Sequence, residues 1–160
     1  MTATALQTAL ESELEYIRQF VTLLEQEQAS LIANTLMELD PLTKQKAALA
    51  QTLEALAKDR KRLFVANGVT LSDDPPHLMT AIRLLPPELL APIASIWVNI
   101  IQAARQASAL NNTNGQLIAT RQQQNQQLMV LLQASQQANL SYDAYGQPRL
   151  SRPSGSLGKV

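Results

Sequence analysis

Few residues of this chain have the chemistry of a catalytic or metal site. The single histidine, His77, could act as a general base, but nothing nearby suggests the nucleophile or carboxylate it would need, so we expect a surface histidine. Cysteine is absent, which excludes disulfides, thiol catalysis and thiolate metal sites and fits a reducing compartment. The sequence also lacks a Gly-rich phosphate loop, paired carboxylates on one face and a His/Cys ligand cluster. We therefore predict no catalytic, cofactor-binding or metal-binding residues, no cofactor, and a protein that is not an enzyme.

The charge balance argues against nucleic acid or a membrane as the partner. Thirteen Lys and Arg residues balance thirteen Asp and Glu residues, so no long-range field holds a polyanion. The basic cluster Lys58–Arg62 has no aromatic residues interleaved with it, and we expect no nucleic-acid binding.

No signal peptide is visible at the N-terminus. The most apolar stretch, Leu89–Ile101, is shorter than the roughly 20 residues that span a bilayer. We expect a cytoplasmic protein with no membrane insertion.

The elements that must position any functional residue are predicted to be helices. Glycine is rare and β-branched runs are few, which argues against a sheet. In three stretches, apolar residues recur at alternating steps of four and three, the spacing of a helix that keeps one stripe on its partners. The stretches begin near Thr4, at Asp40-Pro41 and at Pro86-Pro87, and the last continues to about Ala138. Asn67-Gly68 is a typical helix end, since glycine readily adopts the left-handed conformation there.

The first two helices carry opposite charges. The first is acidic, with Glu11, Glu13, Glu15, Glu25 and Glu27. The second is basic, with Lys44, Lys46, Lys58, Arg60, Lys61 and Arg62. The acidic face is either simply solvated or complements the second helix in an antiparallel hairpin. Each exposed pair would contribute only about 0–1 kcal/mol, so the charges would mainly choose partner and register.

A short helix, His77–Leu85, is expected after the irregular segment that contains Asp73-Asp74-Pro75-Pro76. The predicted fold is therefore all-α, an antiparallel bundle of three long helices plus one short helix, with left-handed coiled-coil-like packing. We predict a helical bundle domain over residues 1–138 and a flexible C-terminal tail over residues 139–160, because the tail is rich in Gly, Pro, Ser and Gln.

The longest helix changes character halfway, at about Asn114-Gly115. Its first half is apolar along the seam, whereas Asn114, Arg121 and Gln124 interrupt the second half. A fresh apolar cluster, Leu128–Leu132, then follows a run of glutamines, and no acidic residue occurs from Leu89 to Tyr142. With about 50 residues against about 30, this helix would exceed the hairpin by roughly 30 Å. The cluster either caps the bundle core or forms an interface with another chain. In the tail, Tyr142 and Tyr145 either anchor a partner or have no role.

Two stretches carry a resemblance to a known family. They are Asn111-Asn112-Thr113-Asn114-Gly115-Gln116-Leu117-Ile118 and Leu140-Ser141-Tyr142-Asp143-Ala144-Tyr145-Gly146-Gln147. Together with the two leading helices, this pattern resembles the FlgN family of flagellar export chaperones over nearly the whole chain. The segment from Asp73 to Pro87 matches no motif of that family.

The resemblance implies a cytoplasmic helical chaperone, a monomer when free. It would bind the C-terminal helical segment of hook–filament junction proteins, the hook-associated proteins, and deliver them to the gate of the flagellar type III export apparatus. Carried onto this sequence, the cargo-binding residues are Leu117, Ile118, Leu128, Leu131 and Leu132. Tyr142 is the residue that would dock on the cytoplasmic domain of the export gate; the family gives no clear role to Tyr145. The alternative function is that of a homo-oligomeric structural coiled-coil protein, in which Asn114 would set the register of a dimer seam.

Overall fold

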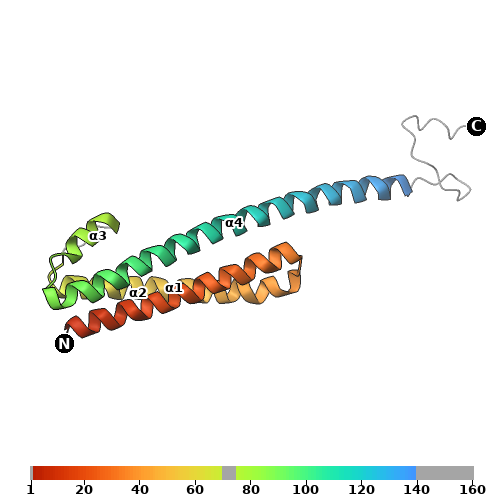
Figure 1. The fold of residues 1–160 in the computed structure, drawn as a ribbon. Coiled ribbons are helices and arrows are strands. Elements are labelled where there is room, and N and C mark those ends of the chain that lie inside the picture. Colours follow the sequence, from red (N-terminus) through yellow and green to blue (C-terminus); the bar gives the residue numbers. More distant parts are fainter. Residues whose placement is uncertain (1, 70–74, 140–160) are drawn as a thin grey trace, which may run out of the picture. The chain divides into compact units, whose positions relative to one another are not determined.

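The computed structural model describes residues 2–69 and 75–139, and these form four helices (Figure 1). They are α1 (Thr2–Ala33), α2 (Leu36–Ala66), α3 (Pro75–Ile82) and α4 (Pro87–Asn139). No strand occurs in these described ranges. The all-α prediction is confirmed, and the lengths of the elements agree with three long helices and one short one.

The chain divides into two compact units, residues 1–116 and residues 117–160. Helix α4 crosses from the first unit into the second, close to the predicted change of character at Asn114-Gly115. The second unit is described only as far as Asn139. The predicted flexible tail therefore lies, apart from its first residue, outside the described residues, and so do Tyr142 and Tyr145.

The connection between α1 and α2 is tighter than the sequence indicated. We expected the second helix to start at Asp40-Pro41, but it starts at Leu36 and contains Pro41, so only Asn34 and Thr35 connect the helices. Asn34 adopts a left-handed φ of 62°. The Glu38 carboxylate then accepts hydrogen bonds from the hydroxyls of Ser30 (3.1 Å) and Thr35 (3.3 Å). These contacts stabilise the turn of helix before Pro41, although the proline lacks a backbone donor.

The end of α2 follows the sequence-based prediction. Gly68 has a φ of 79°, which glycine adopts without strain. The amide of Gly68 donates to the carbonyl of Val65, and that of Val69 donates to the carbonyl of Phe64, both at 3.0 Å. This pair of bonds is the Schellman motif, in which the residue after the glycine also packs back on the helix. Val69 and Phe64 are accordingly both buried in the same core cluster.

Helix α3 is shorter at its C-terminal end than expected. It ends at Ile82 instead of Leu85, and the amides of Leu84 and Leu85 instead close single turns on Ala81 and Ile82, each at 3.0 Å. This turn leaves Leu85 buried and Leu84 exposed. Leu85 therefore contributes to the core from outside the helix.

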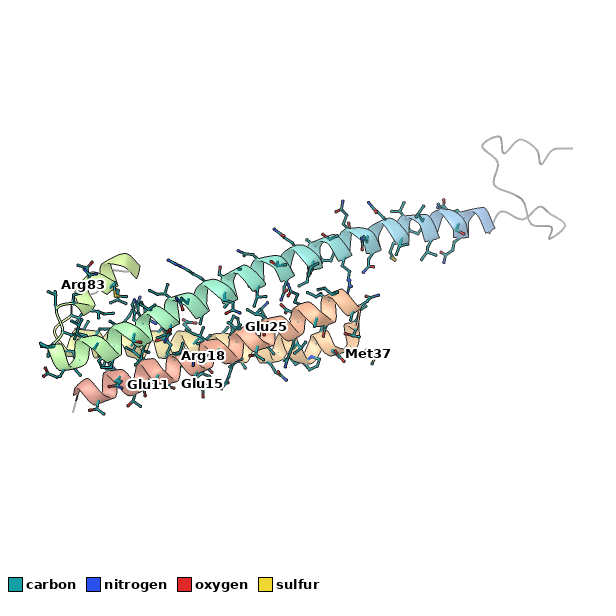
Figure 2. All side chains as sticks on the ribbon, in the orientation of Figure 1. Glu11, Glu15, Arg18, Glu25, Met37 and Arg83 are labelled. Atoms are coloured by element: carbon teal, nitrogen blue, oxygen red, sulfur yellow. The ribbon has the colours of Figure 1, made fainter. Side chains whose placement is uncertain are left out.

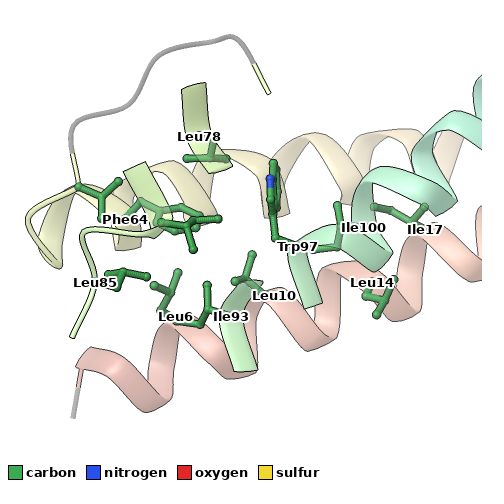
Figure 3. Packing of buried hydrophobic residues seen from close by; sticks show 12 residues of the cluster. Leu6, Leu10, Leu14, Ile17, Phe64, Leu78, Leu85, Ile93, Trp97 and Ile100 are labelled. Atoms are coloured by element: carbon green, nitrogen blue, oxygen red, sulfur yellow. The ribbon is translucent and has the colours of Figure 1, made fainter. Parts of the chain in front are cut away.

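All four helices contribute to the main core of the first unit (Figure 3). Leu6, Leu10, Leu14 and Ile17 come from α1, Phe64 from α2, Leu78 and Ile82 from α3, and Ile93, Trp97 and Ile100 from α4. The rings of Phe64 and Trp97 meet edge to face, with centroids 6.5 Å apart. A second cluster joins Val21 and Leu24 of α1 to Ala107 of α4.

Two ion pairs with buried carboxylates join α1 to α2. Arg60 binds Glu13 and Lys46 binds Glu27, so residue numbers fall along α2 as they rise along α1, and the two helices run antiparallel. Glu13 and Glu27 are buried, whereas Glu11, Glu15 and Glu25 are exposed (Figure 2). Both interpretations of the acidic face therefore hold, each for a different subset of its residues. Because the paired carboxylates are buried, removing one partner would leave an uncompensated charge.

The Glu13–Arg60 pair lies against the aromatic core. The guanidinium carbon of Arg60 is 4.9 Å from the centroid of the Trp97 ring, a cation–π distance. Burial raises the pKa of the Glu13 carboxyl above its usual range, and the charge and hydrogen bond of Arg60 oppose that rise only in part. Glu13 therefore resists ionisation more strongly in the folded protein than in the unfolded chain.

The apolar part of α4 extends beyond Leu89–Ile101, the stretch on which the prediction of no membrane insertion was based. Between Pro87 and Gln137, α4 is long and apolar enough to cross a bilayer, because the helix continues past Ile101 with very few charges. Helices in the cores of soluble proteins pass the same test. Here Ile93, Trp97 and Ile100 of this helix pack into the core of the first unit.

We expect Phe64→Ala to lower the free energy of unfolding by about 3–5 kcal/mol, since it empties a fully buried aromatic site. The matched control is Val65→Ala at the next residue, which is exposed and should change stability by less than about 1 kcal/mol. Urea unfolding followed by circular dichroism measures both. Equal effects in the two variants would contradict the assignment of Phe64 to the core.

The raised pKa of Glu13 predicts a pH dependence. The stabilisation that this group contributes is fully present below its pKa in the unfolded chain and is lost as the pH rises through its pKa in the folded protein. Glutamine does not titrate, so the stability of wild type relative to Glu13→Gln should fall over that interval. Urea unfolding between about pH 4 and pH 7 measures this difference. The exposed control Glu11→Gln should show no such trend, and a wild-type advantage that grows with pH would overturn the prediction.

Candidate partner-binding surface

The polar residue that interrupts the long seam, Asn114, is fully buried in the first unit. Its side-chain NH₂ group donates to the carbonyl of Leu24 and to the carboxylate of Glu27, each at 2.9 Å. The same Glu27 carboxylate accepts from Lys46 of α2 at 3.1 Å. Asn114 therefore joins α4 directly to α1, and Glu27 connects this contact to Lys46 of α2. Its donors bond within its own chain, which removes the argument that this asparagine sets the register of a dimer.

Helix α4 continues without a break through Gly115, although glycine lowers helix propensity by about 1 kcal/mol relative to alanine. A Cβ built at Gly115 would meet no atom within 4 Å, so packing does not require glycine at this position. Gly115 thus lowers the intrinsic stability of the helix beside the boundary between the two units.

The second unit exposes a continuous apolar run, Leu128–Leu132, which we call the apolar collar. Its exposed fractions are Leu128 56%, Met129 59%, Val130 65%, Leu131 65% and Leu132 59%. A soluble protein rarely leaves five consecutive large apolar side chains in water unless they meet something. This exposure favours the interface interpretation of the cluster over the core interpretation.

The other two predicted cargo-binding residues lie nearer the start of the second unit. Leu117 is half-buried and Ile118 is 37% exposed. Leu117 and Leu128 are eleven residues apart, about three helical turns, so they share one side of α4, and Ile118 shares another side with Met129. The predicted residues therefore belong to two neighbouring lines along the same helix.

Met129 and Val130 are as exposed as the predicted residues, but the sequence-based set did not include them. That set was carried over from the family resemblance, which selected Ile118 and Leu132 beside the seam residues but neither Met129 nor Val130. The unbroken run from Leu128 to Leu132 was the available signal, because five consecutive helical residues point to all sides of a helix.

The surroundings of the collar are polar but uncharged. Exposed glutamines and an asparagine cover the turns before it, and Gln133, Gln136 and Gln137 follow it. Arg121, which is half-buried, is the only charged residue between Leu117 and Asn139. A partner here meets amides and hydrocarbon, so electrostatic attraction contributes little to recognition.

The described residues contain no alternative site with evident chemistry. Within residues 2–69 and 75–139, no group of three or more His, Asp and Glu side chains lies close enough to hold a metal ion. The side chain of His77 lies outside the described set, as does Tyr142, so their predicted roles stay predictions.

The first unit is all-α and contains the buried, hydrogen-bonded Asn114, and its last helix continues into an exposed, uncharged apolar surface. These features are typical of a helical binding protein. The comparison with protein families is consistent with this class: residues 1–149 match the family described as FlgN protein. The chain belongs to the FlgN family of flagellar export chaperones. No curated protein and no solved structure matches it.

Proposed function

We propose that this chain is the export chaperone of one or more hook–filament junction proteins. It binds their C-terminal helical segment in the cytoplasm, prevents premature association, and delivers them to the gate of the flagellar type III export apparatus. Family membership supports the chaperone role. The observation that carries the cargo-binding part is the apolar collar, in which every side chain is more than half exposed.

The cargo-binding residues of this proposal are Leu117, Ile118, Leu128, Leu131 and Leu132. A helical cargo segment needs an apolar stripe to lie against, and burial contributes about 25 cal/mol per Å² of apolar surface before the cost of ordering the cargo. No nucleotide or metal is required for such binding. The proposal also includes an antiparallel bundle of the three long helices over residues 1–138, supported by the contacts of α4 with α1 and α2.

The free chaperone is a monomer in this proposal, with no membrane insertion and no nucleic-acid partner. The competing function is a homo-oligomeric coiled coil held together by the collar. The hydrogen bonds of Asn114 within its own chain disfavour it, because a buried asparagine at the dimer seam is the usual means of fixing register. Light scattering separates the two: a monomer that forms a one-to-one complex supports the chaperone, and an obligate dimer without cargo affinity contradicts it.

Co-expression with the C-terminal segments of junction proteins tests cargo binding directly, read as a soluble stoichiometric complex. Leu128→Asp with Leu131→Asp should abolish that complex, because it places two carboxylates on an apolar contact, while helix content by circular dichroism stays nearly intact. Gln123→Asp with Gln127→Asp adds the same charges at exposed polar positions of α4 and should keep the complex. If the leucine variant melts instead, these leucines belong to the core and the interface proposal is wrong.

The proposal assigns gate docking to Tyr142. Tyr142→Ala should weaken binding to the cytoplasmic domain of the export gate by roughly tenfold or more, the effect typical of a binding hot spot, and should leave the affinity for cargo unchanged. Titration of each partner against the same variant measures both. Tyr145→Ala is the comparison within the same tail. Loss of cargo binding in the Tyr142 variant would mean that the tyrosine has a different role.

A further inference from the structure

The apolar collar covers the whole circumference of its helix. Each residue of an α-helix is turned by about 100° from the one before it. Five consecutive residues therefore point to all sides, with no gap wider than about 100°. Since every one of Leu128–Leu132 is between 56% and 65% exposed, no side of α4 is polar at this level.

The five side chains divide into two groups by direction. Leu128, Leu131 and Leu132 lie within an arc of about 100°, which is the width of the stripe that one packed helix covers. Met129 and Val130 point outside that arc. A single partner helix laid along the leucines would leave these two side chains in water.

Two further features of the second unit bear on what covers Met129 and Val130. Ile118, which is 37% exposed, lies about three turns before Met129 on the same side of the helix, and the residues between them on that side are the amides Gln122, Asn125 and Gln126. The uncharged surroundings extend to every side of the helix, because Arg121 is the only charged residue from Leu117 to Asn139. A charged partner surface would lose its hydration on either side without gaining a counter-charge.

We propose that the partner encloses α4 at the collar with two helical segments, one on the Leu128, Leu131 and Leu132 side and one on the Met129 and Val130 side. Both segments are uncharged where they meet the collar, and both belong to one partner chain. When two helices belong to one chain, the second binds intramolecularly after the first has bound, so the loss of rotational and translational freedom occurs only once. Two separate molecules would each lose that freedom. This inference rests on the proposed function, because it specifies how the cargo segment binds.

The test compares two sides of the collar in the full chain, with the junction-protein C-terminal segment that forms the soluble complex as the probe. Met129→Gln with Val130→Gln should raise the dissociation constant by at least about tenfold, although both residues lie outside the arc of the leucines. Glutamine is a good helix former, so circular dichroism should show unchanged helix content. Ile32→Gln with Met37→Gln makes a comparable apolar-to-amide change at exposed residues of the first unit and should leave affinity unchanged.

Two more measurements complete the test. The dissociation constant should change by less than about threefold between about 0.05 and 0.5 M salt, because no charge pair is screened. Light scattering should give one partner chain per chaperone. Wild-type affinity in the Met129/Val130 variant, with loss in the leucine variant, would overturn enclosure while leaving the chaperone function intact. Two partner copies per chaperone, a homodimer through the collar, or a steep salt dependence would also overturn it. A wild-type chain that binds no junction segment would contradict the proposed function itself.

Discussion

The described structure depends on one buried carboxylate. Glu27 of α1 accepts from Lys46 of α2 and from Asn114 of α4, so a single side chain determines how three helices are aligned. A buried charge is tolerated only when it is paired and hydrogen-bonded, and any shift of one helix along another would break one of these bonds. Hydrophobic burial supplies most of the stability of the first unit, but it is not directional, and it would permit neighbouring registers that the Glu27 contacts exclude.

The two units differ in the kind of polar residue that they contain and in where it lies. In the first unit, charges are paired inside the fold, at Glu13–Arg60 and Glu27–Lys46, and the remaining acids face outward from α1. In the second unit, charge is almost absent and amides surround the apolar collar. Amide side chains form hydrogen bonds with water and carry no net charge, so they neither repel nor attract a partner at long range. Such a surface is compatible with the chaperone role of the FlgN family.

Two helix boundaries were predicted incorrectly from the sequence, because contacts with residues outside the local motif determine where these helices begin and end. Asp40-Pro41 has the local chemistry of a helix start, yet α2 begins at Leu36 because Ser30 and Thr35 bond to Glu38 across the turn. Pro86-Pro87 likewise predicted a short helix that reaches Leu85, whereas α3 ends at Ile82 and the turn after it buries Leu85 in the core. The end at Asn67-Gly68 was predicted correctly, since the left-handed glycine and the buried Val69 make that motif local in sequence.

The amino-acid sequence by itself determined the helical class, the three long seams, the end of α2 and the family, because these depend on periodicity, on local turn chemistry and on motifs contiguous in the chain. It also located the change in α4 near Asn114. Only the tertiary structure decided which glutamates are buried, since exposure depends on the facing helix and not on residue type. It likewise decided that Asn114 bonds to its own chain and that Met129 and Val130 are exposed beside the leucines, because burial is a property of what packs against a residue.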